Sequence, residues 1–166
     1  MRILLYGVGG IVILVAALWI AGSLLPVAHV ASGSRVIARS ADDVYKLVSD
    51  VERYSTWWPE VTRTEIVSRE PDGRVRFRQE ASGDTVLMEI VELQPPRRMV
   101  TRIADPEQPF GGTWTFEIEP EGSSTRLTIT ERGEVYNPIF RFLGRFVLGH
   151  TGTIESFLGA AERSAQ

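Results

Sequence analysis

The sequence predicts an α+β domain, an antiparallel sheet covered by a long C-terminal helix, preceded by one transmembrane helix. Three observations carry this prediction. The chain begins with a long uncharged apolar stretch, continues with short alternating segments separated by Gly and Pro turns, and ends with an amphipathic stripe at helical spacing. Short turns join antiparallel neighbours, and the apolar face of the resulting sheet needs a covering element.

The apolar stretch runs from Ile3 to Leu25 without a charged residue. It exceeds the about 20 residues that a helix needs to cross a membrane. The apolar core of a cleaved signal peptide would be shorter, about 7–15 residues, so we favour an uncleaved anchor. We therefore expect an anchor over residues 1–26, a tether over 27–33 and a domain over 34–166. The protein would be a single-pass membrane protein, and the sparse flanking charges favour an extracytoplasmic domain.

A short helical region follows a first strand over residues 36–39. Ser40 is a good N-cap for a helix, and Val44, Leu47 and Val51 recur on one face of it. Pro59 ends this region.

Beyond Pro59 the apolar residues alternate with a period of two, which is typical of strands. Gly and Pro turns divide this part of the chain into separate segments. With the first strand, they predict a sheet of about six to seven strands. The segments run over residues 61–68, 74–80, 85–93, 98–104, 113–119 and 125–130.

The last segment begins at Asn137 and Pro138, a suitable N-cap and first helical residue. Apolar residues then recur at intervals of three and four as far as Ala161. This stripe predicts one long helix. Gly144, Gly149 and Gly152 each weaken it by about 1 kcal/mol relative to Ala, and they would suit a kink or a close approach to another backbone. A strongly curved sheet that grips one helix leaves space between them for an apolar ligand.

Four segments resemble one known superfamily. They are Ser40–Tyr45 with the Asp50, Tyr54, Trp57 and Pro59–Val61 positions, the stretch Gly112–Ile118, the stretch Thr125–Thr128, and the tail that ends in Phe157-Leu158. Together they are similar to the START-like polyketide cyclase and lipid-transfer (SRPBCC) superfamily. The resemblance implies a helix-grip fold with an internal cavity for sterols, lipids, polyketides or other apolar molecules.

The candidate ligand-binding residues lie on the expected strands and on the C-terminal helix. For each apolar one, ordinary core packing is the competing interpretation, because aromatic and Met stripes usually form core. The candidates are Phe77, Met88, Ile90, Trp114, Phe116, Ile118, Glu131, Phe140, Leu143, Val147, His150 and Ile154.

Two of these candidates are polar. His150 lies on the apolar stripe, and its pKa near neutrality would suit an acid, a base or a hydrogen bond to a ligand. Glu131 continues the face of Leu127 and Ile129, so it would point into the cavity unless the strand twists near Gly133. For both we favour the structural interpretation, and we assign no catalytic residue.

Composition excludes several functions. The chain has no Cys, which rules out disulfides and thiolate sites, and its two isolated His residues predict no metal site and no cofactor. Its net charge of −3 is spread along the chain, so we expect no nucleic-acid partner.

The favoured function is a membrane-anchored binder or carrier of a hydrophobic small molecule or lipid. A cyclase or aromatase that uses the same cavity is the first alternative, and a non-catalytic interaction scaffold is the second. The sequence leaves the oligomeric state open.

Overall fold

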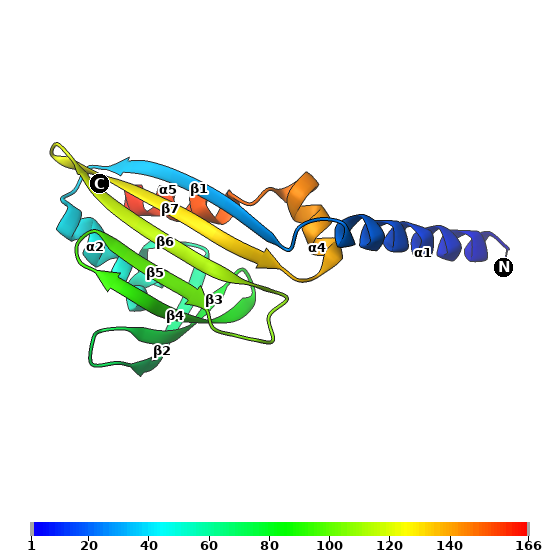
Figure 1. Cartoon of the computed structure of the whole chain (residues 1–166), viewed down its shortest axis with the longest axis horizontal. Coiled ribbons are helices and arrows are strands. Elements are labelled where there is room, and N and C mark those ends of the chain that lie inside the picture. Colours follow the sequence, from blue (N-terminus) through cyan, green and yellow to red (C-terminus); the bar gives the residue numbers. More distant parts are fainter. Residues whose placement is uncertain (1, 166) are drawn as a thin grey trace.

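The computed structural model describes the backbone of residues 2–165 and the side chains of residues 9–147 and 149–165. Seven antiparallel strands form one sheet in the order β1-β7-β6-β5-β4-β3-β2. The strands are β1 (Ala28–Ile37), β2 (Val61–Arg69), β3 (Val75–Ala81), β4 (Asp84–Gln94), β5 (Arg98–Ile103), β6 (Phe110–Glu121) and β7 (Ser124–Val135). The sheet curves around the helices that cover one of its faces (Figure 1).

The covering layer has two parts. One is α2 (Ala41–Ser49) with the short turns η1 (Val51–Arg53) and α3 (Tyr54–Trp57). The other is α5 (Gly152–Arg163), which lies behind β1 and β7 in Figure 1. The expected cap of α2 is confirmed, because the Ser40 hydroxyl accepts a hydrogen bond from the backbone N–H of Asp43. These helices and the concave face of the sheet enclose one hydrophobic core.

The single long C-terminal helix was a wrong prediction. The chain forms α4 (Pro138–Leu143), a π-helical turn η2 (Gly144–Leu148) and then α5, with a break between η2 and α5. At the break, Gly149 has φ +75° and ψ 178°, a backbone conformation that is essentially restricted to glycine. The start of α4 is confirmed, since the Asn137 side chain accepts hydrogen bonds from the N–H groups of Ile139 and Phe140, and Pro138 takes the first helical position.

The first strand is longer than expected. β1 begins at Ala28, so residues 28–33, expected to form a tether, pair with β7 at the edge of the sheet. Gly33 allows α5 to approach this strand, because a Cβ on Gly33 would lie 2.9 Å from Cγ2 of Ile154. The Gly and Ser residues of this segment weaken its strand pattern in the sequence, yet one of them, Gly33, is needed for α5 to pack on β1.

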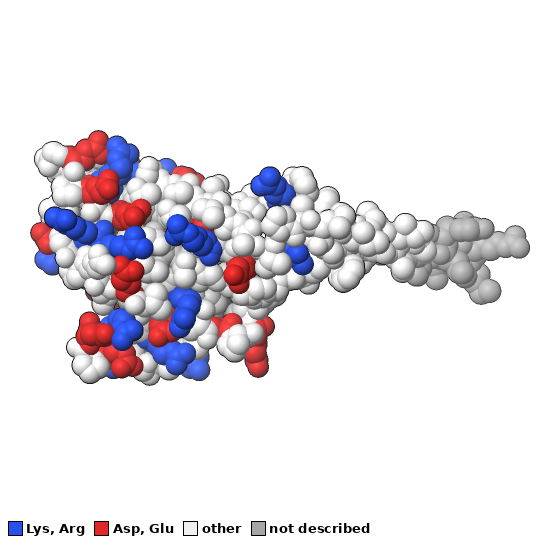
Figure 2. All heavy atoms as spheres, viewed as in Figure 1, with Lys and Arg blue, Asp and Glu red and all other residues white. Residues whose placement is uncertain are grey.

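The first helix, α1 (Arg2–Ser23), extends away from the domain (Figure 1). Charged side chains cover the domain, whereas the described part of α1 beyond its base carries none (Figure 2). At its base α1 packs against α4, where a Cβ on Gly22 would overlap the backbone of Pro138. No helix among the described residues is both long and apolar enough to cross a membrane, so the predicted transmembrane span is not supported. Residues 3–8 of that span lie outside the described side chains.

Candidate functional site: an apolar cavity with a half-buried carboxyl group

An aromatic cluster lies between α3, α5 and the concave face of the sheet. Its centre is Phe157 of α5, which is fully buried. The ring centroid of Phe157 lies 4.9 Å from that of Trp58, 5.0 Å from that of Trp57 and 5.3 Å from that of Phe116. The pairs with Trp57 and Trp58 are edge-to-face, the arrangement that the aromatic quadrupole favours. This cluster fixes α5 against one part of the sheet.

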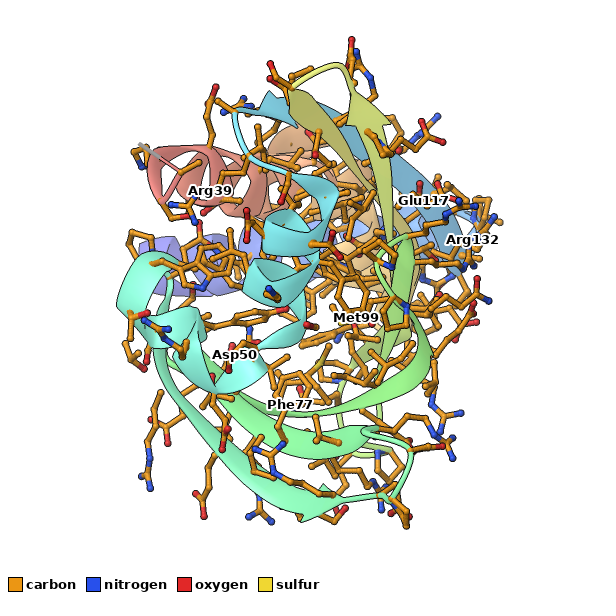
Figure 3. All side chains as sticks on the ribbon, turned by 90° about the vertical axis from the view of Figure 1, so that its left-hand side faces the viewer. Arg39, Asp50, Phe77, Met99, Glu117 and Arg132 are labelled. Carbon is orange, nitrogen blue, oxygen red and sulfur yellow. The ribbon has the colours of Figure 1, made fainter. Side chains whose placement is uncertain are left out.

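Beside the cluster the core is incomplete, and a cavity of about 300 Å³ remains between α5 and strands β3 to β7. Most of its lining is apolar, and the polar exceptions are Gln79, Thr101, Glu131 and Thr153 together with the Tyr54 hydroxyl. The lining residues are Tyr54, Trp58, Phe77, Gln79, Val86, Met88, Thr101, Ile103, Phe110, Trp114, Phe116, Glu131, Thr153 and Phe157. In the end-on view Phe77 and Met99 point into the interior, whereas Glu117 and Arg132 point outward (Figure 3).

Five of the predicted ligand-binding residues line this cavity: Phe77, Met88, Trp114, Phe116 and Glu131. Alternation left open whether Met88 or its neighbour Leu87 faces inward, and the structure selects Met88, which lies opposite Phe77 and lines the cavity.

Three further candidates, Ile90, Ile118 and Ile154, are buried but do not line the cavity. Ile118 and Ile154 are part of the packed core. Ile90 also borders a separate hollow near Tyr45 and Leu93.

Another three candidates lie away from the sheet because the C-terminal helix is broken. Phe140 and Leu143 are on α4, and Val147 is on η2. Phe140 and Val147 are 54% and 65% exposed, so they contribute nothing to the lining. Their helical spacing relative to Ile154 is lost at Gly149, which redirects the chain.

Several lining residues were missed by the sequence analysis. Phe157 lies on the predicted stripe but was not selected, and Trp58, which precedes Pro59, was not selected either. Val86 and Ile103 are on expected strands. Each lies two residues from another lining residue, Met88 and Thr101 respectively, and therefore on the same face of its strand, so strand alternation could have found them. Phe110 and Thr153 lie at element ends, where periodicity carries no information.

Glu131 is the only carboxylate among the lining residues that the structure describes. It lies on the concave face of β7, opposite Trp114 of β6 and Ala31 of β1. Its Oε1 atom lies 3.3 Å from Nε2 of His29. The His29 ring stacks on that of His150, with 3.9 Å between the centroids and 22° between the planes. A carboxyl group and two imidazoles from three separate segments therefore meet at one end of the cavity.

Burial shifts the protonation of all three groups toward the neutral form. It raises the pKa of Glu131, and hydrogen bonding from the Trp114 side chain and the proximity of His150 only partly oppose this shift. Burial also lowers the pKa of His29. It lowers the pKa of His150, an effect that the His29 and Arg145 charges reinforce and the Glu131 charge opposes. A neutral carboxyl group can donate a hydrogen bond as well as accept one.

Glycines make room for this trio. A Cβ on Gly133 would overlap the His29 ring, and a Cβ on Gly144 would lie 2.9 Å from Cε1 of His150. A twist of the strand near Gly133 was expected to turn Glu131 toward water. Instead, Gly133 provides the space for His29, and Glu131 stays on the concave face.

Comparisons with known proteins agree with this architecture. A START superfamily protein from Mycobacterium smegmatis is 25% identical, with a TM-score of 0.67, and the match covers 82% of this chain and 97% of that chain. A protein of Thermus thermophilus is 29% identical, with a TM-score of 0.68, and the match again covers 82% and 97%. The Zhui aromatase/cyclase from a Streptomyces species shares the fold at 16% identity, with a TM-score of 0.66 and coverage of 83% and 93%. No curated protein matches the chain.

The family model described as polyketide cyclase / dehydrase and lipid transport matches residues 28–164, from the start of β1 to the end of α5. This range contains the whole sheet, the cavity and the His29, Glu131 and His150 trio. The chain therefore belongs to the polyketide cyclase / dehydrase and lipid transport family, with the helix-grip fold of START-like proteins.

Proposed function

We propose that the domain is a non-catalytic carrier that holds a hydrophobic small molecule in the cavity between α5 and the sheet. The observation that carries the proposal is the cavity itself, about 300 Å³ with mainly aromatic and aliphatic walls. Its size is at the lower end of the range for ligand sites, about 300–1,000 Å³. It therefore favours a compact molecule or a single alkyl chain over a lipid with two acyl chains.

The polar groups of the cavity suggest how such a ligand would be oriented. The Tyr54 hydroxyl already donates a hydrogen bond to the carbonyl of Val48, 2.6 Å away. Glu131 remains as the main hydrogen-bonding group, and its raised pKa favours a neutral carboxyl that can donate. We expect the apolar body of the ligand to contact Phe77, Met88 and Phe116, and a hydroxyl or carbonyl group of the ligand to face Glu131.

Binding of an apolar fluorescent probe tests the carrier proposal. Val86 lines the cavity, whereas its neighbour Leu87 does not, because side chains alternate across a strand. Val86→Phe should fill the space and weaken probe binding about tenfold or more, and the matched control Leu87→Phe should leave it unchanged. Equal affinities for wild type and both variants, or no probe binding and no co-purified ligand in native mass spectrometry, would refute the proposal.

We further propose that α1 attaches the domain to a membrane as a single-pass anchor, with the domain on the extracytoplasmic side. Two facts support attachment: Ile3 to Leu25 contains no charged residue, and large apolar side chains such as Ile11, Ile13 and Trp19 are exposed along α1. Recovery of the chain in the soluble fraction would contradict attachment. The chain has no Cys, so Ser123→Cys in the β6–β7 turn gives one labelling site. Its reaction with an impermeant maleimide in intact cells would place the domain outside.

A cyclase or aromatase function is the second candidate, and Glu131 is the observation that favours it. In that reaction a carboxylate would remove a proton from carbon next to a carbonyl, and the resulting enolate would attack a second carbonyl of the same chain. Glu131 would then carry that proton and would return it to the new alkoxide, either directly or through His29, whose Nε2 atom lies 3.3 Å from Oε1 of Glu131 and would give up its own proton as it takes this one. The family description and the aromatase/cyclase neighbours agree with this candidate.

Turnover of a poly-β-ketone thioester separates the two candidates. An enzyme should convert it, and Glu131→Gln and His150→Ala should abolish conversion while retaining the fold. A carrier should bind an apolar probe with wild-type protein and with Glu131→Gln and convert nothing.

A further inference from the structure

A further cavity of about 310 Å³, called the second cavity below, lies at the base of α1, and both His29 and His150 line it. Residues 25–30, where the chain leaves α1 and enters β1, form one wall, and Val135 of β7 contributes to it. Arg141 of α4, Arg145 of η2 and His150 complete the lining. The two cavities share a boundary, because His29 lines this one and Glu131, 3.3 Å from His29, lines the other.

The permanent charges among the described lining residues of the second cavity are all positive. Its described lining contains two arginines and two histidines and no carboxylate, and the nearest contacting acid is Glu131, which faces the other cavity. Glu134 accepts a hydrogen bond from the Tyr136 hydroxyl and is not part of the lining. Arginine stays protonated at any physiological pH, so Arg141 and Arg145 keep a fixed positive charge here.

Two hydrogen bonds hold the Arg141 guanidinium in place, but one of its N–H groups has no partner. Its Nη1 atom donates to the carbonyl of Leu25, 2.9 Å away, and its Nη2 atom donates to the carbonyl of Tyr136, 3.3 Å away. Its Nε atom is buried and has no hydrogen-bond partner in the structure. Neither backbone carbonyl neutralises the guanidinium, and a buried N–H without a partner costs about 1–3 kcal/mol.

The histidines add donors. Nε2 of His29 is buried and makes no hydrogen bond, although Glu131 is close to it. His150 is fixed by the stack on His29 and by the space that Gly144 leaves. Two fixed guanidinium charges and two imidazoles around one hollow form a suitable site for carboxylate or phosphate oxygens, since charge-assisted hydrogen bonds are the strong ones.

We propose that this second cavity is an anion site, in which Arg141, Arg145 and His150 bind a carboxylate or phosphate group. The apolar side chains of Leu25, Val27 and Val30 next to these groups favour an anion that carries an alkyl chain, such as the head group of a single-chain amphiphile. The site does not depend on occupancy of the apolar cavity, so it goes beyond the proposed carrier function.

Calorimetric titration of the full chain in a non-ionic detergent tests the proposal with four probes: dodecanoate, dodecanol, acetate and inorganic phosphate. Dodecanoate should bind more tightly than dodecanol, because only the former has a charge for the arginines. Arg145→Gln should weaken dodecanoate binding about tenfold, the effect of losing one charge-assisted hydrogen bond, and leave dodecanol binding unchanged. Arg145→Lys should lie between wild type and Arg145→Gln.

Arg132→Gln is the matched control. Arg132 is an exposed arginine on the outer face of β7, next in sequence to Glu131, so this change removes the same charge without touching the cavity (Figure 3). The chain has two His residues and both line this site, so their ring signals in an NMR spectrum should shift when the anion binds.

The outcomes separate the sources of the anion and the two sites. If acetate and phosphate bind as tightly as dodecanoate, the anion site is supported and its ligand is a small free anion. Val86→Phe should remove dodecanol binding but leave the part of dodecanoate binding that depends on Arg145. The anion site can therefore be tested even if the carrier proposal fails. Equal losses in Arg145→Gln and Arg132→Gln, or anion binding without a shift of either histidine signal, would overturn it.

Discussion

The two halves of the C-terminal segment have the same hydrophobic pattern and opposite environments. In α5, Ile154, Phe157 and Leu158 are fully buried against the sheet. In α4 and η2, Phe140, Phe146 and Val147 are more than half exposed. Apolar spacing shows that a helix has an apolar face, but it does not say what covers that face. The difference arises at Gly149, where the chain changes direction.

The largest expected effect is the loss of the aromatic anchor of α5. Phe157→Ala should reduce the free energy of unfolding by about 3–5 kcal/mol, because a fully buried ring is replaced by a void. Phe146→Ala is the matched change on η2, where the side chain is 64% exposed, and it should stay within about 0.5 kcal/mol. Urea unfolding followed by tryptophan fluorescence measures both. Similar losses of unfolding free energy in the two variants would mean that η2 is packed as tightly as α5.

An intermediate effect is expected at the break between the halves. Gly149→Ala forces a side chain into a backbone conformation that only glycine adopts easily, and it should cost about 1–3 kcal/mol. Gly152→Ala, at the first residue of α5, meets no atom within 4 Å, and it should be neutral or stabilising by up to about 1 kcal/mol. Thermal unfolding of the two variants compares them. A stabilising Gly149→Ala would indicate a continuous helix.

Smaller effects are expected from the groups that titrate near the break, and the first of these is Glu131, whose pKa the charge of His150 influences. Because the folded pKa of Glu131 is raised, the folded state holds this proton more tightly than the unfolded state, and stability falls as the pH rises from the unfolded pKa of about 4.5 through the folded one. Glu131→Gln removes that penalty. Its melting temperature should therefore exceed that of wild type at pH 8 and approach it at pH 4. A difference that grows toward pH 4 would contradict the raised pKa.

The two histidines change the pH dependence of stability in the opposite direction from Glu131. The folded pKa values of His29 and His150 are lowered, so the unfolded state takes up protons first as the pH falls below about 6.5. Wild type should lose stability over that range, and His29→Gln should lose less. Melting curves at pH 7.5 and pH 5.5 test this, and an equal loss in both proteins would exclude His29 as the cause.

Much of the fold could be predicted from the sequence, because the signals that indicate a strand lie within the strand itself and in the turns that flank it. Alternation and turn residues gave most of the sheet, and the caps at Ser40 and Asn137 were correct. The edge strand β1 was underestimated, because Gly33, which leaves room for α5, and its Ser neighbours weaken the strand pattern. Local signals cannot report a contact with a helix more than 100 residues later.

The site was only partly predictable. Strand candidates such as Phe77 and Trp114 follow from alternation. The same rule allows Glu131 on this face, but the favoured interpretation was a twist near Gly133 that would turn it toward water. The stack of His29 on His150 joins the two ends of the domain, so no spacing in the sequence could reveal it. Phe140 and Val147 were selected because periodicity continues across Gly149 although the helix does not.

The central claim is that the cavity beside α5, and not the exposed face of α4 and η2, binds the apolar ligand. Intermolecular nuclear Overhauser effects from dodecanol, measured in deuterated detergent, test it most directly. We predict contacts from the alkyl chain to the Met88 methyl group and the Trp114 ring, and none to the methyl groups of Val147. Contacts to Val147 without any to Met88 or Trp114 would contradict the account.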